Sequence, residues 1–86
     1  MVVLMPRYFL HVNERSALLV DPDGQECADL AAARQEATEA ARDLMAERLR
    51  AGEPLGLHRE MIIADEHGTT FATLSFHEVV PDDNAE

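Results

Sequence analysis

The sequence has a single cysteine and no long apolar run, and each of these two features narrows the class of protein. Cys27 has no partner for an internal disulfide bond, which fits a reducing compartment, and we expect a buried structural thiol. No stretch approaches the roughly 18 consecutive apolar residues of a membrane helix. The N-terminal stretch MVVLMPRYFL lacks the basic region and cleavage site of a signal peptide. We therefore expect a cytoplasmic protein that does not bind membranes.

Basic residues are scarce in this chain, which has seven of them against 17 acids and a formal net charge of −10. All seven bases are arginines. Such an excess of negative charge repels phosphate backbones, so we expect no binding to nucleic acid. The charge favours solubility, and a basic protein is the partner that it would suit best.

Motifs for catalysis and for cofactors are missing as well. The four glycines are scattered at turn positions and form no phosphate-binding loop. Ser16 and Ser75 have no base in a recognisable arrangement, and Cys27 follows no nucleophile motif. The histidines show none of the short spacings that are typical of zinc ligands: His11, His58, His67 and His77. We predict a protein that is not an enzyme and has no catalytic residue, metal site or cofactor.

Two stretches of the sequence resemble each other, LLVDPDGQE (residues 18–26) and IIADEHGTT (residues 62–70), and both contain the pattern D-x-x-G. A calcium loop of the EF-hand type needs glycine at its sixth position and glutamate at its twelfth. Counted from Asp21, glycine stands fourth and Ala32 twelfth, so the pattern fails. We predict two ordinary turns that link strands. The alternative is a weak metal or small-ligand site formed by Asp21, Asp23, Asp65 and His67.

The clearest element is a helix from Leu30 to Ala51, a stretch without glycine or proline and rich in alanine, leucine, glutamate and arginine. Asp29 suits the N-cap, and Gly52 suits the position just after the helix. At helical spacing, one face consists mostly of alanine, which would let the helix lie close to a flat sheet. That face contains Leu30, Ala33, Ala37, Ala40, Ala41 and Leu44.

Strands are expected on both sides of this helix, at residues 7–12, 17–20, 59–64 and 70–76, which are rich in β-forming residues. The predicted fold class is α+β with the order ββαββ. In it, an antiparallel four-stranded sheet carries one long helix packed on one face. We expect an N-terminal extension at residues 1–5, a single domain at residues 6–77 and an acidic C-terminal tail at residues 78–86.

Both faces of the predicted sheet carry large apolar side chains, because residues alternate between the faces along a strand. A single helix covers only one face, so the other face would be left in water. Exposed apolar patches of this kind mark interfaces. We therefore predict a homodimer, formed through the bare face or by pairing of edge strands, with interface residues Phe9, His11, Ile62, Phe71 and Thr73. The alternative is that residues 1–4 or the C-terminal tail fold over this face.

The stretch MPRYFLHV, the D-x-x-G turn, the helix beginning DLAAARQEA and the stretch DEHGTTFATLSF together resemble a family of short, uncharacterised proteobacterial proteins. The resemblance covers about residues 5 to 76. It implies a small cytoplasmic domain of unknown function without an assigned activity, and it suggests Met5 as the natural start. The matching positions are Met5 to Phe9, Asp21, Gly24, Asp29, Leu30, Ala33, Arg34, Glu36, Ala37, Asp65, Gly68 and Phe76.

A weaker likeness is to antitoxins of the HicB type, acidic proteins that neutralise a small basic RNase. They too run from a strand through a turn, in the order proline, acid, glycine, into a helix similar to Gln35 to Arg42. The present chain differs in its Asp-Pro order and in lacking an appended DNA-binding module. We expect a non-catalytic protein-interaction or regulatory domain that acts as a homodimer; an antitoxin-like binder of a small basic protein is the alternative.

Overall fold

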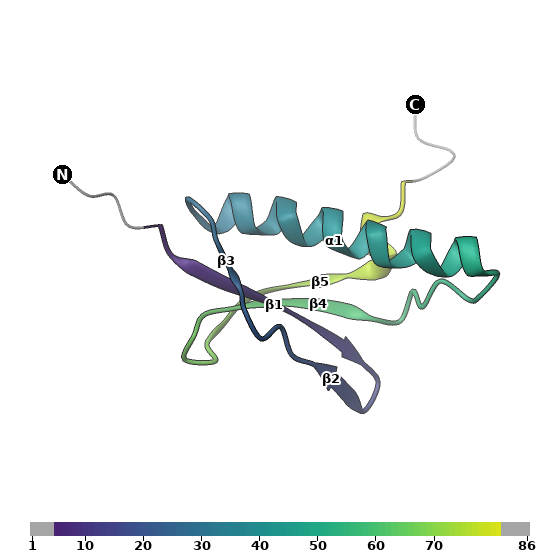
Figure 1. Cartoon of the computed structure of the whole chain (residues 1–86), viewed down its shortest axis with the longest axis horizontal. Helices are drawn as coiled ribbons and strands as arrows, with labels where there is room; N and C mark the ends of the chain where they lie inside the picture. Colours follow the sequence, from purple (N-terminus) through teal and green to yellow (C-terminus); the bar gives the residue numbers. More distant parts are fainter. Residues whose placement is uncertain (1–4, 82–86) are drawn as a thin grey trace.

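The computed structural model describes residues 5–81, so residues 1–4 and 82–86 of the expected extension and tail lie outside the described residues (Figure 1). One long helix lies across one side of an antiparallel sheet, and the protein is therefore of the α+β class. Within the described part, no helix is both long and apolar enough to cross a membrane. In chain order the elements are β1 (Arg7–Glu14), β2 (Ala17–Leu19), β3 (Gln25–Glu26), α1 (Leu30–Ala51), β4 (Glu60–Ala64), β5 (Thr70–Ser75) and the 3-10 helix η1 (Phe76–Val79).

The sheet has five strands rather than the four expected, and its order is β2-β1-β4-β5 with β3 also paired to β1. All pairs are antiparallel. The additional strand arises because the edge partner of β1 is divided in two by the DPDG turn. β2 pairs with the end of β1, whereas β3 pairs with its beginning, through Arg7↔Glu26 and Tyr8↔Gln25. Two residues are too few for a sequence pattern to reveal a strand.

Both ends of α1 lie at the predicted residues. The side chain of Asp29 accepts a hydrogen bond from the Ala32 amide at 2.9 Å and so satisfies a free N–H of the first turn. Gly52 ends the helix in the left-handed conformation, with φ at 75°, and its N–H donates to the carbonyls of Arg48 and Leu49. The prediction of one long helix from Leu30 to Ala51 is confirmed.

The core lies between α1 and the sheet. The helix contributes Ala33, Ala37 and Ala41, none of which has any exposed surface, and Met45 follows one turn later. Small side chains allow the helix to approach the strands closely. The sheet contributes the side chains that alternate toward the helix, which are Tyr8, Val12, Met61, Ile63 and Leu74.

The short helix η1 closes the core beyond β5. Phe76 is fully buried and Val79 nearly so. The hydroxyl of Ser75 accepts from the His77 amide, and the Glu78 carboxylate accepts from the Ser75 amide, which makes a capping box. The chain is therefore packed two residues past the domain end that we expected at residue 77.

Arg59 fixes the loop between α1 and β4. The residue is 4% exposed, and its guanidinium donates to the carbonyl oxygens of Gly56 at 3.2 Å and Leu55 at 2.7 Å. The guanidinium also lies over the ring of Phe76, 4.4 Å from the centroid. Burial, and after it the positive charge of Arg48, lower the pKa of Arg59, and Glu14 opposes this change. The loop is thus held to the core by a buried cation.

Gly56 is required by the position of that cation. Its φ is +75°, and an added Cβ would lie 2.5 Å from Nε of Arg59 and 2.6 Å from Nη1 of Arg48. Two guanidinium groups therefore approach the same backbone position. Gly52 has the same φ of +75° but has no neighbour within 4 Å of such a Cβ.

We predict that Gly56→Ala lowers the free energy of unfolding by about 2–4 kcal/mol, of which roughly 1–2 kcal/mol is the left-handed backbone and the remainder the displacement of hydrogen-bonded Arg59. Gly52→Ala carries only the backbone part and should lose roughly 1–2 kcal/mol. Urea unfolding of the two variants measures the difference. Equal losses in both would show that Arg48 and Arg59 adjust without cost.

Candidate functional site

The sheet face turned away from α1, which we call the open sheet face, carries four of the five predicted interface residues. His11, Ile62 and Thr73 are direct cross-strand partners and form one row across β1, β4 and β5. Phe9 lies on the same face opposite Ala64, and its ring stacks on the His11 imidazole with centroids 6.2 Å apart. Thr73 is exposed, and the other three are half-buried.

Phe71 is the exception among the five. Thr70 pairs with Ala64 and Ala72 pairs with Ile63, so that Phe71 falls at a shift in register and has no opposite residue. Its ring packs edge-on against Tyr8 at a centroid distance of 5.8 Å, and Tyr8 belongs to the core. A bulge of this kind changes the direction in which a side chain points, and the alternation of residues along a strand does not predict that change.

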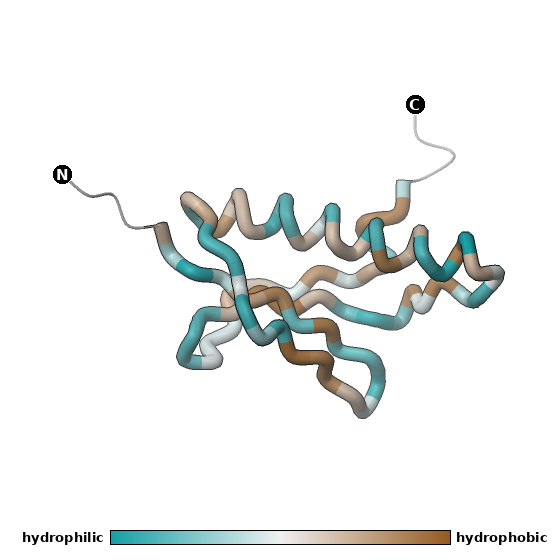
Figure 2. Tube along the Cα trace, in the orientation of Figure 1, coloured by the Kyte–Doolittle hydropathy of each residue, from teal (hydrophilic) through white to brown (hydrophobic). Residues whose placement is uncertain are grey.

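Two exposed residues extend the open sheet face and were absent from the predicted set. Leu18 pairs with Asn13 at the edge strand β2 and is 52% exposed, and Val20, just after this strand, is 63% exposed. Figure 2 shows the apolar character of this segment at the free edge of the sheet. The sequence ALLV contained the signal, because its alternate residues share a face with His11.

The DPDG turn is attached to β1 through Asp21. Its carboxylate accepts from the amides of Asp23 and Gly24 at 3.1 Å each, and from the amide of Leu10 at 3.2 Å. The Asp21 amide donates to Nδ1 of His11 at 3.0 Å. Burial alone would raise the pKa of Asp21, but the N–H donors of Gly24, Leu10 and Asp23 outweigh it and lower this pKa below 3.8. The turn thus replaces the missing strand partner in the middle of β1.

The DEHG turn uses the same device. The Asp65 carboxylate accepts from the amides of His67 at 2.8 Å and Thr69 at 2.9 Å, and the Thr69 amide is the main cause of the lowered pKa of Asp65. The two turns face each other across a hollow of about 250 Å³ at the end of the open sheet face, beside Phe9 and His11. Within residues 5–81, no three His, Cys, Asp or Glu side chains are grouped so as to hold a metal ion. Asp21 and Asp65 serve to hold backbone amides.

We predict that Asp21→Asn lowers the free energy of unfolding at neutral pH by about 1–3 kcal/mol, because an amide accepts fewer of the three N–H donors. A carboxylate whose pKa is lowered by folding stabilises the protein above its unfolded pKa. That contribution is lost as the pH falls from about 4 through the folded value. The free energies of unfolding of the wild type and the variant should therefore converge as the pH falls below about 4 and through the folded pKa of Asp21.

Asp23→Asn is the matched control for this prediction. It removes the same charge from the same turn, but the Asp23 side chain accepts no hydrogen bond among the described residues. This variant should follow the wild type at every pH. Thermal melts at several pH values measure both, and a parallel loss in the two variants would count against the role of Asp21.

Comparison with known proteins gives one match. A family model described as Domain of unknown function (DUF6894) matches residues 7–77, which span β1 to the middle of η1. No curated protein matches the chain. No solved structure matches it either. With most of its length covered by this one model, the chain belongs to the DUF6894 family of domains of unknown function.

Proposed function

We propose that this protein is a non-catalytic interaction domain that forms a homodimer through its open sheet face. The observation that carries the proposal is the row His11–Ile62–Thr73, which crosses three strands on the side that α1 does not cover. Leu18 and Val20 extend this row to the edge of the sheet. Burying one large aliphatic side chain contributes roughly 1.5–3 kcal/mol, so a face of this composition gains from a partner.

A second copy of the chain is the occupant that suits the chemistry of this face. The row itself, and the pair Phe9–Ala64 beside it, contain no acidic side chain although the chain has 17 acids. Glu60, one row away, already accepts from the side chain of Asn13 at 3.4 Å. A basic partner would need acids here, whereas a row without acids is complementary to itself across a two-fold axis.

The size of the face limits the strength of the association. Strands about 4.8 Å apart and residues about 3.3 Å apart give a face roughly 15–20 Å on each side. The projected area of such a face is below the roughly 800 Å² that each partner buries in a standard stable interface. The dimer should therefore have a dissociation constant in the micromolar range, and both species should be present at ordinary laboratory concentrations.

Salt distinguishes this proposal from the antitoxin-like alternative. Two copies that each carry a net charge of −10 repel each other. Added salt screens this repulsion, so the dimer should become tighter as salt increases. Binding of a small basic protein would depend on attraction between opposite charges and should weaken instead. The sign of the salt dependence therefore separates the two functions.

The test is sedimentation equilibrium from about 10 to 500 µM protein, at low and at high salt. We expect a monomer–dimer equilibrium that shifts toward dimer at high salt. Thr73→Asp places one negative charge in the row of each copy, so that the dimer would hold two like charges. It should weaken the dimer at least tenfold, or about 1.4 kcal/mol. Thr73 is exposed on a strand at the sheet edge, so the variant should keep its fold.

Thr38→Asp is the control, because it introduces the same charge on the helix α1, on the other side of the sheet. This variant should dimerise like the wild type. A wild-type protein that remains monomeric at the highest concentration and salt would refute the proposal, and so would an equal effect of both substitutions.

A further inference from the structure

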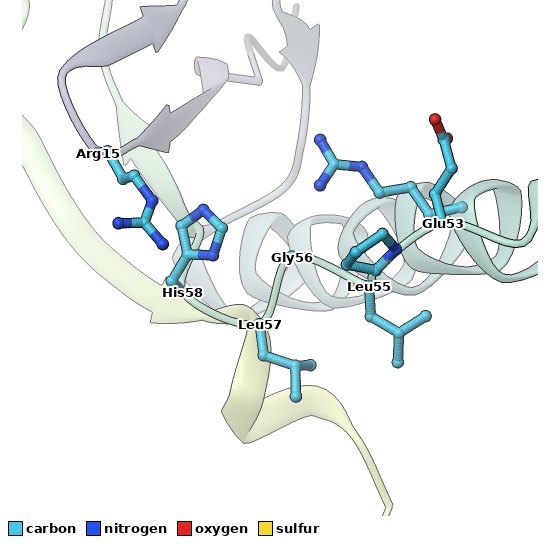
Figure 3. A pocket seen from close by; sticks show the side chains of 8 residues that line it. Arg15, Glu53, Leu55, Gly56, Leu57 and His58 are labelled. Atoms are coloured by element: carbon cyan, nitrogen blue, oxygen red, sulfur yellow. The ribbon is translucent and has the colours of Figure 1, made fainter.

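A cavity lies at the end of the molecule opposite to the two turns. It has a volume of about 730 Å³ and lies between the C-terminal end of α1, the loop after it and the β1–β2 hairpin. In Figure 3, Arg15 and His58 stand on one side of it, and Glu53 and Leu55 on the other. The volume falls within the range of small-molecule sites, roughly 300–1,000 Å³.

Positive charge is concentrated at this cavity. Arg15 and Arg48 line it, and buried Arg59 lies directly behind Gly56 in its wall. The acids beside these three arginines are Glu14 and Glu53. Three of the seven basic residues of an otherwise acidic chain thus meet at one place.

The carboxylate of Glu14 neutralises only part of this charge. One of its oxygens, Oε2, serves both Nη2 of Arg48 at 3.2 Å and Nε2 of His58 at 3.5 Å. The hydrogen bond from Arg48 is the main cause of the lowered pKa of Glu14. Nη1 of Arg48 instead points to Gly56, where Nε of Arg59 is its neighbour. Arg59 is occupied by two backbone carbonyls, and within residues 5–81 no carboxylate lies within ion-pair distance of it.

Arg15 is placed at the mouth of the cavity by the hairpin. It is the only residue other than glycine with a positive φ, 55°, in residues 5–81, and it is the first of the two turn residues between Glu14 and Ala17. Asparagine and glycine suit this conformation better than arginine does. In the described part of the chain its guanidinium forms no ion pair or hydrogen bond. Its side chain is therefore not needed by the fold and is free to bind.

We infer that this cavity binds a small organic anion, with its carboxylate or phosphate head on Arg15 and Arg48 and a short apolar body against Leu55 and Leu57. Planar guanidinium groups suit the oxygens of both kinds of head. His58 lines the same end, where its Nε2 is paired with Glu14, and Arg59 is a positioning residue that holds Gly56 and adds charge from behind.

The net charge of the chain does not oppose such a ligand at cellular salt. The Debye length there is about 8 Å, so acids farther away are largely screened, whereas the arginines of the cavity act at contact distance. The inference is independent of the proposed dimer, because none of its residues belongs to the row His11–Ile62–Thr73.

The test is a titration of the full-length, ¹⁵N-labelled protein followed by amide chemical shifts. The probes are hexanoate, phenyl phosphate and inorganic phosphate, with methyl hexanoate as the uncharged counterpart of hexanoate. We expect saturable shifts at Arg15, Gly56, Leu57 and His58 with hexanoate or phenyl phosphate below about 10 mM, and none with methyl hexanoate. Tighter binding of hexanoate identifies a carboxylate ligand, and tighter binding of phenyl phosphate identifies a phosphate ligand.

Two variants with the same loss of charge decide whether the cavity is the site. Arg15→Gln should weaken binding roughly tenfold or more, because charge-assisted hydrogen bonds are lost. Arg50→Gln, on the exposed last turn of α1, should leave it unchanged. The proposal is overturned if no probe saturates, if Arg15→Gln binds normally, or if both variants lose affinity equally. Inorganic phosphate that binds as well as phenyl phosphate would refute the role given to Leu55 and Leu57.

Discussion

The close packing of α1 on one side of the sheet is the interaction on which the rest of the structure depends. Ala33, Ala37 and Ala41 have no exposed surface, so the helix backbone lies directly over Met61 and Ile63. A small domain buries a limited share of its surface, and here one helix supplies nearly all the cover. The face that it does not cover holds His11, Ile62 and Thr73, and that face follows from having one helix and four strands side by side.

The central strand β1 imposes a second constraint, because each of its amides needs an acceptor. β2 and β3 serve its two ends, and the DPDG turn interrupts them in the middle. There the Asp21 carboxylate accepts from the Leu10 amide, and a buried amide left without an acceptor would cost about 1–3 kcal/mol. The feature of the sequence that most resembled a metal loop thus serves the sheet.

The parts of the fold that depend on local sequence could be predicted, and those that depend on pairing could not. Asp29 and Gly52 mark the ends of α1 because capping is a property of a few neighbouring residues. The strand β3 and the displaced Phe71 arise from how β1 and β4 meet other strands, and no local pattern records this. Four of the five predicted interface residues lie together on one face because alternation holds wherever a strand is regular.

The cavity at the C-terminal end of α1, with its arginines, could not be predicted from the sequence for a similar reason. Arg15, Arg48 and His58 come from a hairpin, a helix end and a loop, and they meet only after folding. The spacing of the histidines argued against a zinc site, and the strongly negative net charge argued against binding to nucleic acid, so neither pointed to this cavity. Net charge, however, is a sum over the whole chain, whereas a ligand is bound by the charges within a few ångströms.

The acidic side chains of the chain are distributed unevenly, so its surfaces differ in charge. The exposed side of α1 carries much of it, through Glu36, Glu39, Asp43 and Glu47. The row across the open sheet face is free of acids, and the cavity at the end of α1 has more arginines than acids. In the dimer that we propose, the acidic helix surfaces stay apart, and the two copies meet along the row without acids, where like charges repel each other least. Much of the negative charge therefore lies away from the two surfaces for which we propose ligands, the open sheet face and the arginine end of α1.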